Sequence, residues 1–468
     1  MVVLLTSLTT DELNNMTLKS INPFTNGLIN EVEEFSDDQL EKALKESCRA
    51  FEMWKKTDFA SRKSLMGKAA ILLRTNVNKY AVSITGEMGK PVKESRAEVE
   101  KCAWICDYYA QNAERFLSRE TIETDADISY VTFEPLGSIL GVMPWNFPFW
   151  QVFRFAVPTL MAGNTVLLKH ASNVQICASL IKNIFDESEF PASVFSNLVI
   201  GSGRVEKVIK HDCVKAVSLT GSEFAGQKVG EAAGSVLKKS LLELGGSNAF
   251  IVLDDADILK AVEIAIKARF QNAGQSCIAA KRFIVDRKIS GKFIELLADG
   301  IGRLKTGDPM EDDTDIGPLA SIEHAEKVED QVRRSVAMGA KVITGGIRDR
   351  AFFRPAIITD VIPGMPLFDE EVFGPAAPLT IAGNTGEAIT LACQTNFGLG
   401  VSLFTNDLKK ANDLVPEFHD GAVFINGMVK SDPRLPFGGT RRSGYGRELA
   451  VQGIREFVNV KSVWMKKL

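Results

Sequence analysis

The chain has 468 residues, of which 45% are hydrophobic and 24% charged, as in an ordinary soluble globular protein. Lys and Arg total 55 and Asp and Glu total 59, so the formal net charge is −4. This composition excludes a disordered chain, a collagen-like chain and a coiled coil. The net charge gives no global attraction to nucleic acid, and the length predicts several domains with large cores.

Cysteine and histidine are too scattered to form a recognisable metal site or disulfide framework. The seven cysteines include no CxxC pair, and the four histidines include no HxH or HExxH motif. We therefore expect no metal site and free thiols in a reducing compartment, with the cytoplasm as the predicted location.

The two most apolar segments do not predict insertion into a membrane. Residues 1–15 lack the basic start and cleavage pattern of a signal peptide, so we expect a frayed extension ahead of Met16. Residues 136–153 carry no charge, but Pro144, Asn146 and Pro148 interrupt them, which favours the wall of a pocket. We predict no membrane partner.

The first quarter of the chain predicts a helical layer. Apolar residues recur at three- and four-residue spacing over residues 36–118, and Ser36 with Gln39 has the pattern of a capping box. Residues 121–134 then alternate in polarity, which predicts a strand pair outside the helical layer.

From residue 137 onward, short apolar strands alternate with helices. A first series has expected strands at 138–143, 164–169, 196–201, 215–222 and 241–244. A second has expected strands at 249–255, 281–286, 341–346, 376–382, 400–405 and 421–426. Such alternation predicts an α/β fold with parallel, doubly wound sheets. The two series meet near Gly245 and Gly246, so we expect two α/β domains with a cleft between them.

Two expected strand ends carry residues suited to a dinucleotide, although the GxGxxG signature is missing. Gly221 and Ser222 begin a helix whose free backbone N–H groups could accept a pyrophosphate. Lys169 ends another strand, and its segment KHAS holds no carboxylate to repel a 2′-phosphate, so NADP should be tolerated as well as NAD. Two alternatives stay open, in which Ser222 only caps the helix and Lys169 is only a solvated lysine.

Three further residues have the chemistry of a nucleophile, a base and an oxyanion donor. Cys277 lies in the polar turn NAGQSC, where partial exposure and backbone donors favour a reactive thiolate. Glu243 ends the apolar strand SLLEL, and desolvation there raises the pKa of a carboxyl toward that of a useful base. Asn146 lies in the proline-stiffened loop MPWNFPFW and could donate to a developing alkoxide. A purely structural role stays open for each.

Motifs spread along the chain resemble those of a known family. PWNFP, LTGS, LELGG, GQSC, EEVFGP and PFGG…SGYGRE occur in this order and resemble the aldehyde dehydrogenase superfamily from about Ile21 to Trp464. ITGEMGKP, MPWNFPFWQVFR, LLKHASN and FINGMVKSD are similar to segments of bacterial NAD(P)-dependent succinate semialdehyde dehydrogenases. The resemblance implies three parts: a cofactor domain (1–118 and 138–244), a catalytic domain (245–437) and an oligomerisation element (119–137 and 438–468).

The same resemblance implies roles for individual residues. Cys277 matches the nucleophile, Glu243 the general base, and Asn146 the amide that holds the oxyanion together with the Cys277 N–H. The implied reaction adds the thiolate to an aldehyde, transfers hydride to the nicotinamide, and hydrolyses the resulting thioester with water activated by Glu243. The matched cofactor positions are Trp145, Lys169, His170, Ala171, Ser172, Gly221, Ser222, Leu244, Phe373 and Glu371, the last expected on the nicotinamide-side ribose.

Departures from the family pattern bear on the cofactor and the substrate. Ser172 stands where NAD-preferring members often have Glu, which favours NADP. Arg154 matches an Arg that some succinate semialdehyde dehydrogenases use to bind the distal carboxylate, a group that a guanidinium fork suits. Gln271 replaces a second such Arg, so Ser431 could supply a hydroxyl instead. A structural ion pair stays open for Arg154.

Several other functions compete with oxidation of succinate semialdehyde. Glutarate semialdehyde or a medium-chain aldehyde would suit the same machinery, whereas CoA-acylating relatives typically lack the Glu base. The presence of Cys277, Glu243 and Asn146 argues against a non-catalytic protein on this fold. A cysteine hydrolase without cofactor lacks a suitably placed His. We expect a homodimer or a dimer of dimers.

Overall fold

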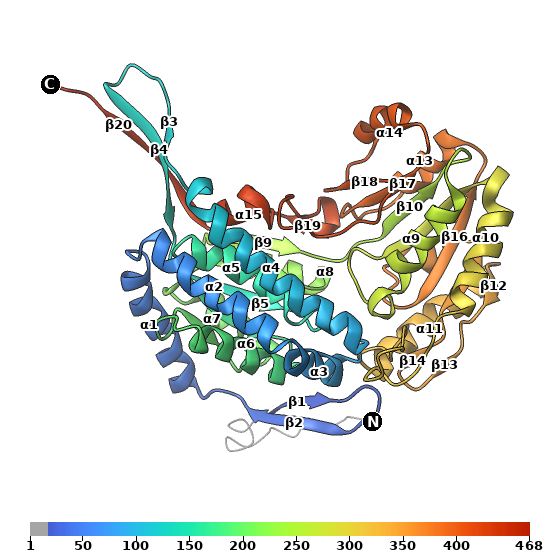
Figure 1. Cartoon of the computed structure of the whole chain (residues 1–468), viewed down its shortest axis with the longest axis horizontal. Coiled ribbons are helices and arrows are strands. Elements are labelled where there is room, and N and C mark those ends of the chain that lie inside the picture. The colour runs from blue at the N-terminus through green and yellow to red at the C-terminus, as the bar shows by residue number, and fades with distance from the viewer. Residues whose placement is uncertain (1–16) are drawn as a thin grey trace, which may run out of the picture.

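The structure, a computed structural model, describes residues 17–468. The prediction for residues 1–15 therefore lies outside the described residues. Two large β-sheets with helices packed around them make up most of the molecule, and a narrow three-stranded sheet projects from it (Figure 1). The predicted α/β class, with two doubly wound sheets, is confirmed.

The chain begins with a hairpin and a helical layer. The predicted capping box is present at the first helix, where the Gln39 N–H donates to Ser36 and the Ser36 N–H donates to the Gln39 side chain. The elements are β1 (Thr17–Ile21), β2 (Leu28–Glu33), α1 (Asp37–Trp54), α2 (Phe59–Thr75), α3 (Val77–Met88) and α4 (Val92–Phe116).

The first large sheet has the strand order β19-β9-β8-β5-β6-β7. Its strands are parallel except β19, which runs antiparallel to β9. The strands are β5 (Ser138–Met143), β6 (Thr165–His170), β7 (Phe195–Asn197), β8 (Val214–Thr220), β9 (Lys239–Glu243) and β19 (Gly444–Tyr445). Helices α5 (Trp150–Met161), α6 (Gln175–Glu187), α7 (Val205–Lys210) and α8 (Glu223–Ser235) connect them.

The second large sheet has the order β12-β15-β16-β11-β10-β17-β18, and only β12 is antiparallel to its neighbour. Its strands are β10 (Asn248–Val252), β11 (Ala280–Asp286), β12 (Lys341–Thr344), β15 (Ala356–Thr359), β16 (Ala376–Ala382), β17 (Val401–Phe404) and β18 (Val423–Ile425). Its helices are α9 (Ile258–Phe270), α10 (Arg287–Gly302), α11 (Ile322–Ala337), α12 (Pro366–Asp369), α13 (Thr385–Cys393) and α14 (Leu408–Leu414). A small hairpin, β13 (Arg348–Asp349) and β14 (Phe352–Phe353), lies beside α11.

The projecting sheet contains the predicted strand pair. β4 (Ile128–Pro135) lies between β3 (Glu120–Thr121) and the C-terminal strand β20 (Val458–Met465). The rest of the expected oligomerisation segment lies elsewhere: β19 extends the first large sheet, and α15 (Ala450–Arg455) packs on α4 and α5. The backbone of β19 pairs with the open edge of β9, which the sequence pattern alone does not reveal.

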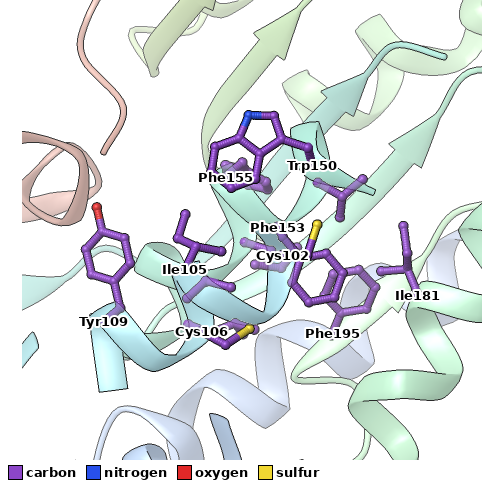
Figure 2. Close-up of a cluster of buried hydrophobic side chains, with 14 of the residues drawn as sticks. Cys102, Ile105, Cys106, Tyr109, Trp150, Phe153, Phe155, Ile181 and Phe195 are labelled. Carbon is purple, nitrogen blue, oxygen red and sulfur yellow. The ribbon is translucent and has the colours of Figure 1, made fainter. Parts of the chain in front are cut away.

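A buried core fixes α4 against α5 (Figure 2). Cys102 and Cys106 on α4 pack among the aromatic side chains of α5. Cys177 is also buried, whereas Cys393 is only half-buried. Within residues 17–468, no helix is long and apolar enough to cross a membrane.

Candidate active site

Two cavities meet at Cys277. One, of about 180 Å³, lies between α4, α5 and the 428–437 segment, and the other, of about 240 Å³, lies at the carboxyl ends of β5, β8 and β9. Cys277 and Gln151 line both cavities. Ligands of doubly wound sheets bind at the carboxyl ends of the strands, so the second cavity has the place of a cofactor site and the first that of a substrate site.

The turn that carries Cys277 is strained and tied to the Asn146 loop. Asn272 and Ala273, in the short 3₁₀ segment Gln271–Gly274, have φ of 53° and 50°, a left-handed conformation that non-glycine residues rarely adopt. The Asn272 side chain donates to the Asn146 carbonyl at 2.8 Å, and its backbone N–H donates to Glu94 at 2.7 Å. These bonds hold Cys277 in a fixed position relative to Asn146.

The Asn146 side chain lies on the cofactor-side cavity together with Cys277. Its Nδ2 group donates one N–H to the Gln275 carbonyl at 3.1 Å, which orients the amide. An amide nitrogen carries two N–H donors, so the second is available to an oxyanion that forms beside the cysteine.

Burial raises the pKa of the Cys277 thiol to about 11, and the cations of Arg154 and Lys281 only partly oppose this rise. At neutral pH the thiol is therefore mostly protonated. A reaction at this sulfur requires that the proton leave before or during the attack.

Glu243 is a buried carboxyl without a hydrogen-bond partner among residues 17–468. Burial and the neighbouring Glu448 raise its pKa well above the usual range. Its carboxyl lies against Gly438, where a Cβ atom would be 2.7 Å from Oε1, and it lines neither of the two cavities. The carboxyl therefore does not face the cavities that Cys277 lines, and no hydrogen bond among the described residues restrains its rotation.

Predicted cofactor residues gather on the larger cavity. Its lining includes Trp145, Gly221, Ser222, Leu244, Glu371 and Phe373. Ser222 also caps α8 by accepting the Ala225 N–H at 3.3 Å, so the two interpretations of this residue coexist. Trp145 packs edge-on against Phe373, with ring centroids 5.9 Å apart.

Glu371 is held in place by groups that the sequence did not single out. It accepts the Gly246 N–H at 3.0 Å and forms an ion pair with buried Lys281, which also donates to the Cys277 carbonyl at 3.1 Å. A Cβ atom at Gly245 would lie 2.3 Å from the Glu371 carboxylate, so only glycine allows this approach. Lys281 therefore couples the cofactor wall to the nucleophile turn.

The residues at the end of β6 have different roles. Lys169 is 6% exposed and therefore not a solvated lysine. The Ala171 N–H donates to His170 Nδ1, so Nε2 carries the ring proton and donates to the Pro148 carbonyl at 2.8 Å. Burial lowers the pKa of His170 to about 4. The neutral His170 ring anchors the Asn146 loop, while Ser172 follows it, half-buried.

Two features near the predicted cofactor residues were not found from the sequence. Helix α11 contributes His324, Lys327 and Gln331 to the larger cavity, although nothing in its amphipathic pattern marks them. A groove of about 620 Å³ lies between α7 and α8, with Val142, Leu219 and Phe224 among its lining residues.

Both predicted substrate residues line the smaller cavity, each with partners already in place. Arg154 is 1% exposed, forms an ion pair with Glu448 and donates to Thr220 at 3.3 Å. Ser431 accepts from Trp150 Nε1 at 3.1 Å and from Lys101 Nζ at 2.8 Å. The sequence did not point to Lys101, because nothing in its pattern distinguishes this lysine from the other lysines of a long amphipathic helix.

The sequence profile of the aldehyde dehydrogenase family matches residues 10–463. The chain belongs to the aldehyde dehydrogenase family. It is thus an NAD(P)-dependent oxidoreductase, as the motifs indicated.

Several individual proteins that this aldehyde dehydrogenase resembles are succinate semialdehyde dehydrogenases. A probable NADP(+) succinate-semialdehyde dehydrogenase of Synechocystis is 45% identical, over 96% of this chain and 100% of its own length. The Escherichia coli succinate semialdehyde dehydrogenase [NAD(P)+] Sad is 40% identical, over 96% and 98%. The structure of succinic semialdehyde dehydrogenase from Streptococcus pyogenes in complex with NADP+ superposes with a TM-score of 0.94 at 37% identity, covering 96% of this chain and all of that one.

Proposed function

We propose that this aldehyde dehydrogenase oxidises succinate semialdehyde to succinate with NADP or NAD, and that Cys277, Glu243 and Asn146 carry the chemistry. The observation that supports this substrate most is the small cavity beside Cys277, because its wall presents the cations of Arg154 and Lys101 together with the hydroxyl of Ser431. The similarity to succinate semialdehyde dehydrogenases over nearly the whole chain supports the same substrate.

The larger cavity fits a nicotinamide dinucleotide. The first N–H groups of α8, those of Glu223 and Phe224 next to Gly221 and Ser222, are free within residues 17–468 to bind a pyrophosphate, and Glu371 lies where it can accept a ribose hydroxyl. The dinucleotide accepts hydride when bound. Lys169 and Ser172 at the end of β6 present no carboxylate of their own to a 2′-phosphate, which supports use of NADP.

In the proposed reaction, the Cys277 thiol loses its proton to solvent water as its sulfur attacks the aldehyde carbon. The second N–H of Asn146 and the Cys277 backbone N–H hold the oxyanion that develops. Loss of hydride from this carbon to the nicotinamide leaves a thioester on Cys277. Glu243 then rotates from Gly438 toward the cavity, where solvation lowers its pKa and its proton passes to solvent water. The carboxylate takes a proton from the water that hydrolyses the thioester, and the Cys277 sulfur leaves as a thiolate.

We further infer that the enzyme is a homo-oligomer of the cytoplasm. β20 pairs with β4 along one edge only within residues 17–468, so its outer edge offers unpaired N–H and C=O groups. Ile128, Val460, Trp464 and Met465 are exposed on this projecting sheet, which favours pairing with a second copy. The cysteines are all free, which suits a reducing compartment.

Initial rates with NADP test the substrate proposal. Succinate semialdehyde and butanal differ by the distal carboxylate, so kcat/KM should favour the charged aldehyde by at least ~100-fold, or ~2.7 kcal/mol. Glutarate semialdehyde, one methylene longer, should be slower. Equal rates with butanal would reject a carboxylate-binding substrate site.

A further inference from the structure

Lys101 lies on the wall of the substrate cavity in a site built around its ammonium group. It projects from α4, donates to Ser431 Oγ at 2.8 Å and lies over the Trp150 ring with Nζ 4.0 Å from the centroid. Trp150 Nε1 donates to the same Ser431 oxygen. Since Oγ accepts from both neighbours, its own O–H remains to donate to a third group.

Of the charged side chains on this cavity, Arg154 and Glu98 have ion-pair partners, whereas Lys101 has none within residues 17–468. Arg154 is paired with Glu448, and Glu98 is paired with Lys90 and accepts the N–H groups of Phe149 and Trp150. Glu94 accepts the Asn272 N–H. Within residues 17–468, Lys101 has no carboxylate oxygen inside 4 Å, unlike these neighbours. Lys430, also on the cavity, is exposed, so water compensates its charge.

We propose that Lys101, with the Ser431 hydroxyl, binds the distal carboxylate of the substrate. Arg154 contributes less to binding this carboxylate, because Glu448 already pairs with its charge. This inference rests on the proposed function and identifies the group that recognises the negative end of the aldehyde. Burial and the nearby Arg154 lower the pKa of Lys101 to about 8, as expected for a cation that lacks a counterion until a carboxylate arrives.

The shape of the cavity agrees with a short aldehyde that ends in a carboxylate. Phe147, Ile278, Met428 and Phe437 line it alongside the polar groups, and Cys277 lines the same cavity as Ser431. A linear substrate can place its carbonyl at the sulfur and its methylenes on these apolar side chains. The carboxylate then meets the ammonium, the hydroxyl and the rim of the indole ring.

The test compares kcat/KM for succinate semialdehyde and butanal in the wild-type oligomer and in Lys101→Met. We expect Lys101→Met to lose at least ~30-fold toward succinate semialdehyde, mainly through KM, and to change less than ~3-fold toward butanal. Lys101→Arg should recover part of the loss, because it keeps the cation. Lys93→Met removes the same charge from the same helix outside the cavity and should behave as wild type.

The possible outcomes separate the two proposals. Equal losses with both aldehydes in Lys101→Met would mean that Lys101 only supports Ser431 and Trp150, and would overturn the inference. If Lys430→Met lost the preference for succinate semialdehyde over butanal while Lys101→Met kept it, Lys430 would be the residue that binds the carboxylate. That result would also overturn the inference. A wild-type enzyme without preference for the charged aldehyde would reject the proposed function itself, whatever the variants do.

Discussion

At the scale of single residues, burial raises the pKa of the two proposed reactive groups, Cys277 and Glu243, and so disfavours their ionised forms. Cys277 is held protonated by a raised pKa, and Glu243 is a carboxyl without hydrogen bonds among residues 17–468, whose pKa is raised by burial and by Glu448. A protonated thiol is a poor nucleophile. In the proposed mechanism, rotation of Glu243 into the cavity supplies the base for hydrolysis.

The raised pKa of Cys277 makes a specific prediction for alkylation. Only the thiolate reacts, and its fraction grows tenfold per pH unit below the pKa. The rate of inactivation by iodoacetamide in the cofactor-free enzyme should therefore climb through pH 7–9 without levelling, since the pKa is about 11. Mass spectrometry of the labelled peptide identifies Cys277 as the site. A plateau below pH 8 would contradict a protonated, partly buried thiol.

Residue-scale prediction from sequence succeeded where a local pattern reflects the local environment. The polar turn predicted the partial exposure of Cys277, and the apolar strand predicted the burial of Glu243. The proline-containing loop predicted a fixed position for Asn146, whose amide is held by a hydrogen bond. Sequence patterns did not reveal contacts with partners far along the chain. The predicted cofactor position His170 has its ring hydrogen-bonded to the Pro148 carbonyl. Arg154 pairs with Glu448, nearly 300 residues later, and no spacing rule announces that contact.

At the scale of elements, the alternation of strands and helices predicted both sheets because parallel strands are buried on both faces and read as apolar runs. The prediction included a strand at 341–346 but not that β12 runs antiparallel to its neighbour, and it missed the short strands β15 and β19. The strand pair at 121–134 was visible by its alternating polarity, and its partner β20 supplies the exposed edge.

A charged edge should disrupt assembly through β20. Val460→Glu combined with Trp464→Glu places two carboxylates on the exposed strand, where a second copy would bury them at a cost of several kcal/mol. The double variant should fall to monomers in light scattering coupled to size exclusion, with an unchanged circular dichroism spectrum. Leu237→Glu, an exposed apolar site on the cofactor domain, is the matched control. An unchanged oligomer in the double variant would exclude β20 from the interface.

At the scale of the whole molecule, the proposed catalytic residues come from both halves of the chain. Asn146 and Glu243 lie at the ends of strands of the first sheet, whereas Cys277 precedes β11 of the second. Hydrogen bonds from the Asn146 side chain to the Gln275 carbonyl and from the Asn272 side chain to the Asn146 carbonyl tie the halves together. The cofactor-side and substrate-side cavities therefore meet at the boundary of two sheets, with Cys277 between them.

The most direct measurement is the mass of the Glu243→Gln variant after mixing with NADP and succinate semialdehyde. The amide in this variant cannot deprotonate water, so hydrolysis should be slowed far more than acylation. We predict one burst of NADPH per site and a succinyl group on the peptide that contains Cys277, absent after treatment with butanal alone and absent in Cys277→Ser. Steady turnover in Glu243→Gln, or an NADPH burst without a succinyl adduct on Cys277, would contradict this prediction.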